Sequence, residues 1–354
     1  MNILKIVFSC LMLIACSHSP QWSKKQKPNT VSVMTYNLEN LFDTLHDKDR
    51  EDFAYLPKNQ KGPYIKECKK IRNTYYQKIC LTLDWTQSVL DKKLDNLATA
   101  ILQVNKGRGP DILIVTEVEN LNVLKQLNKK LKRAHYNITH IEGFDKRGID
   151  IAFLSRLKRK GKPTLHRIAF KAKNARDKKW MMRSRGILEA TMILPSGELA
   201  NIFGVHFPSP RNPTYWRAQA IETLNRLVNR LPKNRLALAG GDFNITRKEN
   251  NRKYFYEKIL GKVWKVSHLM GCDSCQGTYP YKGSWSFLDA LLLRRALHPW
   301  HIDKKSVGIP NRTRVQLNPY SNPARFNAKT GYGTSDHFPI YLQIQLNKQT
   351  LPKK

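Results

Sequence analysis

The chain has 354 residues, of which 41% are hydrophobic and 25% are charged. This balance allows a sizeable core and excludes a globally disordered polypeptide. Lysine and arginine total 62 against 27 aspartate and glutamate, a formal charge of +35, so the surface should attract polyanions such as nucleic acid, anionic lipid or acidic glycan. A host whose proteins are generally basic would give the same excess, so charge alone does not name a partner.

The N-terminal residues are expected to direct export rather than to fold. An apolar stretch over residues 6–15 is too short to span a bilayer and ends in the letters LIAC at Cys16. This run resembles a bacterial lipobox, which predicts a lipoprotein signal peptide over residues 1–15 and lipidation of Cys16. A plain cleaved signal peptide and an uncleaved anchor are the alternatives. Residues 16–29 would tether the domain to the membrane, and a Gram-negative host would carry the protein on its outer membrane, facing the periplasm or the cell surface.

Four further cysteines, Cys68, Cys80, Cys272 and Cys275, form an even set. In an exported protein such a set predicts two disulfides, and sequence proximity favours Cys68–Cys80 and Cys272–Cys275. One four-thiolate zinc site is the weaker alternative, because Cys68 and Cys80 are too far apart for the usual ligand spacing. Cys272 and Cys275 could also form a redox motif, but the thioredoxin-like βαβ setting is missing around them.

The apolar pattern predicts strands and helices in mixed order, without a strict βαβ repeat. This order favours two packed sheets with helices outside, an α+β sandwich in one domain over residues 30–348, followed by a basic tail over 349–354. In chain order we predict a strand over 30–36, a long loop or insertion over 46–90, a helix over 91–104, a strand over 111–115, a helix over 122–133, a strand over 150–154, a strand pair over 186–193 and 199–205, a helix over 213–231, and strands over 235–239, 286–293 and 340–346.

Acidic, amide and imidazole side chains stand at the ends of several of these strands, where active sites usually form. Any one of them alone is more often a turn or cap residue. It is their order along the chain that carries information. The set comprises YNLEN at 36–40, TEVEN at 116–120, GID at 148–150, GVHF at 204–207, GDFN at 241–244, FLD at 287–289 and SDHFP at 335–339.

Together these runs resemble the motifs of the endonuclease/exonuclease/phosphatase family, which includes deoxyribonuclease I, abasic-site endonucleases, sphingomyelinases and inositol-phosphate phosphatases. The resemblance covers residues 31–344, and GDFN and SDH are its most specific parts. It implies a deoxyribonuclease I-like four-layer αββα sandwich with the site at one edge of the two sheets. It also implies a metal-dependent phosphodiester hydrolase.

Phosphodiester hydrolysis needs a cation for the phosphoryl oxygens, an in-line water and an acid for the leaving oxygen. Mg²⁺ is the expected cation, with Ca²⁺ or Mn²⁺ as alternatives, and hard cations take oxygen ligands. The resemblance makes Glu117 the principal ligand, with Asn37 nearby and Glu39 and Asp336 as candidate further ligands. Some family members carry Asp where this chain has Glu39, so direct metal contact is least secure there.

Asp242 and Asn244 alternate with Phe243, so their side chains should face one side of an extended segment. The resemblance assigns Asp242 to orienting or deprotonating the water and Asn244 to the phosphate oxygens. His337 and Asp289 resemble the family's His–Asp pair, in which the carboxylate keeps the imidazole protonated.

His206 resembles a second histidine found in some branches of the family, a candidate acid for the leaving group. We hypothesise that Asp150 is its carboxylate partner. The alternative is that Asp150 is a strand-end residue that pairs with Arg147 or Arg156.

The family fixes the reaction more closely than the substrate. Basic stretches interleaved with aromatic residues suit nucleic acid bound through its phosphates, although charge runs are usually solvated faces. We therefore expect a non-specific endonuclease that acts on DNA or RNA outside the cytoplasm, as a monomer without a protein partner. The aromatic residues in question include Tyr75, Tyr76, Trp180, Trp216 and Trp285.

Two other functions stay open. A phospholipid or sphingomyelin phosphodiesterase, or a phosphatase of the same family, would suit a lipid-anchored protein, but no convincing exposed hydrophobic hairpin is present in the sequence. A non-catalytic polyanion-binding protein would have lost part of the motif set. Against it stand the intact Glu117, Asp242, Asn244, Asp289 and His337.

Overall fold

The computed structural model describes residues 24–25 and 29–347. The predicted signal peptide, Cys16, most of the predicted tether and the basic tail lie outside the described residues. Within the described part of the chain, no helix has both the length and the apolar character needed to cross a membrane.

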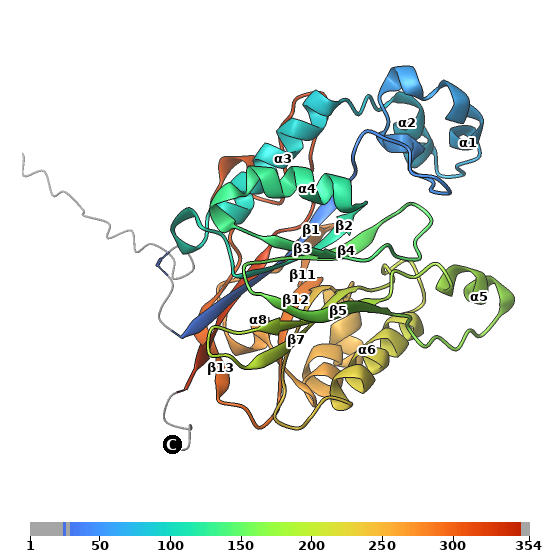
Figure 1. The fold of residues 1–354 in the computed structure, drawn as a ribbon. Helices are drawn as coiled ribbons and strands as arrows, with labels where there is room; N and C mark the ends of the chain where they lie inside the picture. Colours follow the sequence, from blue (N-terminus) through green and yellow to red (C-terminus); the bar gives the residue numbers. More distant parts are fainter. Residues whose placement is uncertain (1–23, 26–28, 348–354) are drawn as a thin grey trace, which may run out of the picture.

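Two six-stranded sheets lie face to face (Figure 1). In each sheet one central pair of strands is parallel, β1 with β2 and β7 with β8, and the other neighbours are antiparallel. The first sheet has the order β13 (Trp300–Gly308), β14 (Ile340–Leu346), β1 (Thr30–Leu41), β2 (Ile112–Val118), β4 (Asp150–Ser155), β3 (Asn137–His140), and the second β5 (Arg159–His166), β6 (Ile187–Ile193), β7 (Leu199–His206), β8 (Leu236–Asp242), β12 (Asp289–Arg294), β9 (Trp264–Val266).

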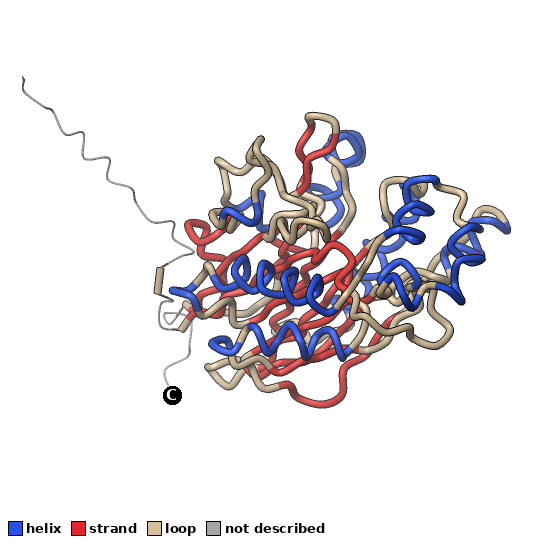
Figure 2. Tube along the Cα trace, turned by 90° about the horizontal axis from the view of Figure 1, so that it is seen from above, coloured by secondary structure: helices blue, strands red, loops and turns tan. Residues whose placement is uncertain are grey.

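Helices cover the outer face of each sheet. The helices α3 (Gln87–Leu102) and α4 (Leu121–Lys130) bury leucines against the first sheet, and Figure 2 shows helices lying across the strands. On the second sheet, α6 (Thr214–Asn229) packs together with a π-helix, Phe255–Leu260. A third apolar cluster fills the space between the two sheets. The predicted four-layer αββα sandwich is therefore confirmed.

The prediction of a long loop over residues 46–90 was wrong in part. The segment contains α1 (Ile65–Lys69) and α2 (Thr74–Thr82), which the Cys68–Cys80 disulfide joins. These helices are too short to show an apolar period, and α2 begins instead at a local cap, because the Asn73 side chain accepts a hydrogen bond from Tyr76 N at 3.1 Å. Residues 44–86, called the insertion below, project from one end of the sandwich (Figure 1).

The predicted strand over 286–293 is really two elements. Ser284–Ser286 (β11) pairs with Tyr279–Tyr281 (β10) in a separate hairpin, and β12 begins only at Asp289. Two long strands had not been predicted, β5 and β13. Both carry many charged residues and lie at sheet edges, where one side of the backbone has no partner strand and charge prevents aggregation. Among the other strands and α-helices, β3, β9, α5 (Ala175–Met181), α7 (Arg247–Lys253) and α8 (Ser267–Met270) had not been predicted either.

Candidate active site

The strand register brings three of the predicted residues side by side on the second sheet. His206 at the end of β7 is paired with Asp242 at the end of β8, and Asp242 is paired with Asp289 at the start of β12. All three lie at one edge of the sandwich because β12 runs antiparallel to the other two strands.

Glycines before Asp242 allow this edge to pack closely. Gly241 has φ +139°, and a Cβ there would lie 1.9 Å from the carbonyl oxygen of Val205. A Cβ on Gly240 would meet Ile114 of the first sheet and Leu291 at 2.7 Å. A side chain at either position would push the strands or the sheets apart, so the Gly-Gly-Asp sequence is required by packing.

Bulges in the first sheet place Glu117 and Asn37 opposite Asp242. Glu117 interrupts the pairing of β2 with β4 and has φ +60°, an uncommon conformation for a non-glycine residue. The carboxylate accepts hydrogen bonds from Asn37 Nδ2 at 3.1 Å and from Asn40 N at 2.9 Å. Asn37 Nδ2 also lies 3.2 Å from Asp242 Oδ2. Its amide therefore bridges the two sheets.

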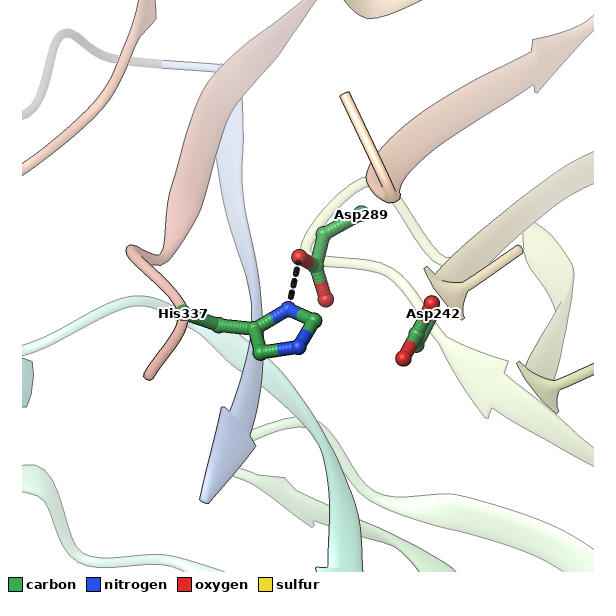
Figure 3. A group of neighbouring side chains, drawn as sticks. All are labelled: Asp242, Asp289 and His337. Atoms are coloured by element: carbon green, nitrogen blue, oxygen red, sulfur yellow. Dashed lines mark hydrogen bonds and ion pairs between the residues drawn. The ribbon is translucent and has the colours of Figure 1, made fainter. Parts of the chain in front are cut away.

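Four buried residues, His206, Asp242, Asp289 and His337, form what we call the inner group. His337 Nδ1 lies 2.7 Å from Asp289 Oδ2, and Asp242 lies across from this pair in Figure 3. His206 Nε2 is 3.7 Å from Asp242 Oδ2 and 3.8 Å from Glu117 Oε1. Asn244, with φ +54°, donates its amide Nδ2 to Phe207 O at 2.9 Å, while its backbone N donates to Asp242 Oδ1 at 2.8 Å.

Burial sets the charges of the inner group. Burial, and then the neighbouring Asp289 carboxylate, raise the pKa of Asp242 to about 8. Burial, and then Arg185 and Arg147, hold the pKa of His206 well below its usual value. Burial opposes protonation of His337 as well, but the Asp289 carboxylate outweighs it and holds the pKa of His337 well above its usual value. In this state His337, rather than His206, carries the proton that a leaving oxygen would need.

The hypothesis that Asp150 pairs with His206 was wrong. Asp150 Oδ2 lies 2.9 Å from His140 Nε2, and Asp150 Oδ1 accepts a hydrogen bond from Gly143 N at 2.8 Å. The partner comes from β3, a strand too short to have been predicted, which pairs with β4 and brings His140 to this position. His206 Nδ1 is buried without a hydrogen-bond partner among the described residues.

The alternative partners of Asp150 were also wrong, because both arginines have other carboxylates. Arg156 binds Asp111 through Nη2 at 3.0 Å. Arg147 Nε lies 3.5 Å from Asp145 Oδ1, and Arg185 Nη2 lies 2.9 Å from the second oxygen of Asp145. Arg147 and Arg185, called the arginine pair below, had not been predicted to lie beside His206, because nothing in the sequence distinguishes this pair from the other basic residues. Asp145 holds them beside His206, and Arg185 Nε has no hydrogen-bond partner among the described residues.

The predicted metal candidates Glu39 and Asp336 are joined by an arginine that the sequence analysis did not single out. Arg325 Nη1 donates to Glu39 Oε1 at 2.8 Å, and Arg325 Nη2 donates to Asp336 Oδ2 at 2.5 Å. These three residues form the outer group. Below them lies Lys93, a buried residue whose amine donates to the carbonyl oxygen of Glu39.

The second disulfide lies in the segment just before Thr278, a residue that contacts the backbone beside the His–Asp pair. Cys272 and Cys275 are joined, as predicted, so the four cysteines form two separate pairs rather than one zinc site. Shortly after this small ring, Thr278 Oγ1 accepts a hydrogen bond from the backbone N–H of Asp289 at 3.1 Å. The carbonyl oxygen of Thr278 accepts from Phe338 N at 2.8 Å. One residue therefore fixes the backbone beside both members of the pair.

Two places on this edge could hold a cation. Glu117 offers a carboxylate whose hydrogen-bonding partners, Asn37 and Asn40, are both neutral, which fits a hard divalent ion. One side-chain atom each from Asp242, Asp289 and His337 also lie within 4.8 Å of one another. A protonated His337 repels a cation, so Glu117 is the more favourable position for the ion. Asn37 presents its nitrogen to Glu117 while its oxygen accepts from Glu39 N at 2.9 Å, so a ligand role for that oxygen requires the amide to turn.

Comparison with known proteins agrees with this arrangement. The sequence pattern of the endonuclease/exonuclease/phosphatase family matches residues 32–346. Similar solved structures include a humanized D. rerio TDP2 (TM-score 0.57, 15% identity, covering 90% of this chain and 99% of that one) and the endonuclease/exonuclease/phosphatase from Bacteroides vulgatus (0.54, 14%, 90% and 99%). D. rerio TDP2 complexed with a single-strand DNA product is also similar (0.52, 16%, 89% and 99%). No curated protein sequence matches the chain.

Proposed function

The chain belongs to the endonuclease/exonuclease/phosphatase family, and from this premise we propose that it is a metal-dependent phosphodiester hydrolase that cleaves nucleic acid outside the cytoplasm. One observation carries the proposal. The buried edge places a protonated imidazole, His337, and a carboxylate of raised pKa, Asp242, next to Glu117, an oxygen ligand suited to a divalent cation.

Each residue then has a task that its surroundings support. Asp242 orients the attacking water and takes its proton: with a pKa of about 8 only part of the carboxyl is ionised near neutral pH, but that ionised fraction is a strong base, and it grows as pH rises. His337 donates a proton, or a charged hydrogen bond, to the oxygen that leaves, and Asp289 holds the ring in place through Nδ1. Asn244, fixed by its bond to Phe207 O, is left to contact a phosphate oxygen.

A divalent ion at Glu117 would stabilise the negative charge that develops on the phosphate oxygens during hydrolysis. His206 lies between Glu117 and Asp242 and is neutral, so it can offer one N–H to the substrate without competing with the ion. The arginine pair adds fixed positive charge on the same side.

Nucleic acid is the substrate that the surface favours. The insertion follows the end of β1 at the active edge. The segment that contains α5 leads into β6, whose first residue pairs with Val205, next to His206, so it also flanks this edge. The insertion and α5 project from the same side of the molecule (Figure 1). They expose aromatic rings, Tyr75 and Tyr76 on α2 and Trp180 on α5, and Arg183 lies over the Trp180 ring. Exposed rings among cations bind the bases and phosphates of a strand. The DNA product bound to D. rerio TDP2 makes single-stranded DNA a sensible first test.

The test is to incubate the full-length protein with single-stranded DNA, plasmid DNA, RNA and sphingomyelin, in the presence of Mg²⁺, Ca²⁺, Mn²⁺ or a chelator. We expect cleavage of nucleic acid that the chelator abolishes and that Asp242→Ala and His337→Ala abolish. Cleavage of sphingomyelin alone would replace the proposal with the lipid alternative. Binding of DNA without any cleavage would favour the non-catalytic protein. DNA binding that does not weaken as salt rises would remove the argument from charge.

Export through a lipid anchor is a separate part of the proposal. It rests on the LIAC run at Cys16, and incorporation of labelled palmitate tests it directly. We expect label in the wild-type protein and none in Cys16→Ala. Label in neither protein would point to a plain signal peptide or an uncleaved anchor. We also expect a monomer, which analytical ultracentrifugation of the full-length protein in detergent can check.

A further inference from the structure

Arg325 lies where two carboxylates from distant parts of the chain come together. It joins Glu39, in the bulge of β1, to Asp336, in the segment before β14, with distances of 2.8 Å and 2.5 Å. The other oxygen of Glu39 accepts from Phe326 N at 3.3 Å. Both oxygens of Glu39 are therefore engaged by the segment that carries Arg325.

Building on the proposed function, we propose that Arg325 takes the place of a second divalent cation. The protein then holds one ion, at Glu117, and the outer group binds none. A guanidinium is charged at every physiological pH, and its planar fork matches a pair of carboxylates. A second ion could enter only by displacing this side chain or by lying next to its positive charge.

The residues below the outer group strengthen this argument. The amine of Lys93 donates to the carbonyl oxygen of Glu39 and lies 3.5 Å from the carbonyl oxygen of Asn40. It is also 5.8 Å from the centre of the Trp85 ring and 5.6 Å from that of Phe326, which hold it in place. The two carboxylates thus have one guanidinium in direct contact and one amine nearby, bonded to the backbone of Glu39, which leaves little net negative charge to attract an ion.

Glu117 differs from the outer group in its direct contacts. Its carboxylate accepts from the Asn37 amide and from the Asn40 backbone, both neutral donors. The nearest imidazole, His206, lies 3.8 Å away. Among the described residues, no lysine or arginine forms an ion pair with Glu117 within 4.0 Å. Lys93 and Arg147 add positive charge nearby, but neither contacts the Glu117 carboxylate directly, so its oxygens stay open to an ion.

The number of bound ions tests the proposal. Full-length protein is titrated with Mn²⁺, and the electron paramagnetic resonance signal of free Mn²⁺ gives the number bound. We expect one ion for the wild type, two for Arg325→Met, which keeps the length of the side chain without its charge, and one for Arg325→Lys. The double variant Arg325→Met/Asp336→Asn should return to one. Arg247→Met, which changes an exposed arginine outside the outer group, should stay at one.

Two ions in the wild type, or one ion in an Arg325→Met protein whose circular dichroism and melting temperature match the wild type, would overturn the proposal. If Arg325→Met does not fold, Asp336→Asn decides. We expect its Mn²⁺ affinity to stay within about twofold of the wild type. Removing a metal ligand or its support lowers the affinity by roughly 10-fold or more, so a loss of that size would overturn the proposal. A wild type that binds no Mn²⁺ would instead remove the metal-dependent function itself, so the two failures are distinguishable.

Discussion

The inner and outer groups lie at the same edge of the sandwich but acquire their charges in different ways. Side chains of the inner group are at most 6% exposed, whereas in the outer group Glu39 is 12%, Asp336 18% and Arg325 56% exposed. Burial dominates the inner group and leaves His337, beside Asp289, as its charged imidazole. In the outer group burial also raises the pKa of Glu39, to about 8, but the exposed Arg325 guanidinium contacts both carboxylates directly and offsets part of their charge. The comparison suggests that the inner group performs the chemistry and that the outer group limits how many cations the site holds.

Replacement of Asp242 by Asn should have the largest effect. The substitution keeps the shape but removes the base, and we expect kcat/KM for bis(p-nitrophenyl) phosphate to fall by about 10³-fold, within the range for loss of a general base. Initial rates measured with Mg²⁺ give the comparison. Glu222→Gln, which changes an exposed carboxylate on α6, is the matched control and should have wild-type activity. Less than a tenfold loss for Asp242→Asn would break the assignment of chemistry to the inner group.

Replacement of Asp289 by Asn should have a smaller effect that depends on pH. Asp289 raises the pKa of His337, so in the wild type the imidazole keeps its proton above neutral pH. Without that carboxylate, burial lowers the pKa and the proton is lost at lower pH. We expect about a 10²-fold loss of kcat/KM at pH 8 and a smaller loss near pH 5, so the alkaline limb of the profile moves to lower pH. Parallel profiles for the two proteins would mean that Asp289 does not act through the His337 proton.

Replacement of Asp336 by Asn should change activity less again. Arg325 already balances this carboxylate, and Asp336 lies 4.0 Å from His337 Nε2, beyond a hydrogen bond. We expect less than roughly a tenfold loss of kcat/KM, in line with the modest worth of partly exposed ion pairs. Steady-state rates of the Asp336→Asn and Asp242→Asn variants, measured side by side, test the difference between the two groups. Equal losses in the two variants would show that the inner and outer groups are one functional unit.

The difference between the two groups also explains what the sequence could predict. Asp242, Asp289 and His206 each end or begin an apolar strand, so their meeting follows from strand register, which a buried pattern fixes. Arg325 lies in the irregular segment before β14, where no period marks it, and it is one of 62 lysines and arginines. Its pairing with Glu39 spans 286 residues. Such a contact depends on the fold as a whole.

Short or charged elements caused the other differences. The partner of Asp150 was missed because β3 has only four residues, Asn137–His140, and one of them supplies the imidazole. The strand β5 was missed because RKGKPTLH has no apolar alternation. The two disulfides, by contrast, were predicted from sequence proximity alone, because each closes a short loop. The catalytic roles and the metal ligands stay predictions until they are measured.

Trp180 lies outside both groups and should give the smallest effect. Its ring is 52% exposed on α5, with the Arg183 guanidinium 5.0 Å from the ring centre. In an Asp242→Asn background, which prevents cleavage, we expect Trp180→Ala to weaken binding of a fluorescent single-stranded oligonucleotide by about fivefold, the lower end for loss of one base-stacking ring.

A matched control and a small substrate complete this test. Leu297→Ala changes a side chain that is 81% exposed beyond the far end of β12, so oligonucleotide binding should be unaffected. Hydrolysis of bis(p-nitrophenyl) phosphate by Trp180→Ala in the otherwise wild-type protein should also be unaffected, because that substrate is too small to reach α5. If small-substrate hydrolysis falls together with oligonucleotide binding, Trp180 supports the inner group instead of contacting a strand. The nucleic-acid proposal would then rest on the basic charge and the arginine pair alone.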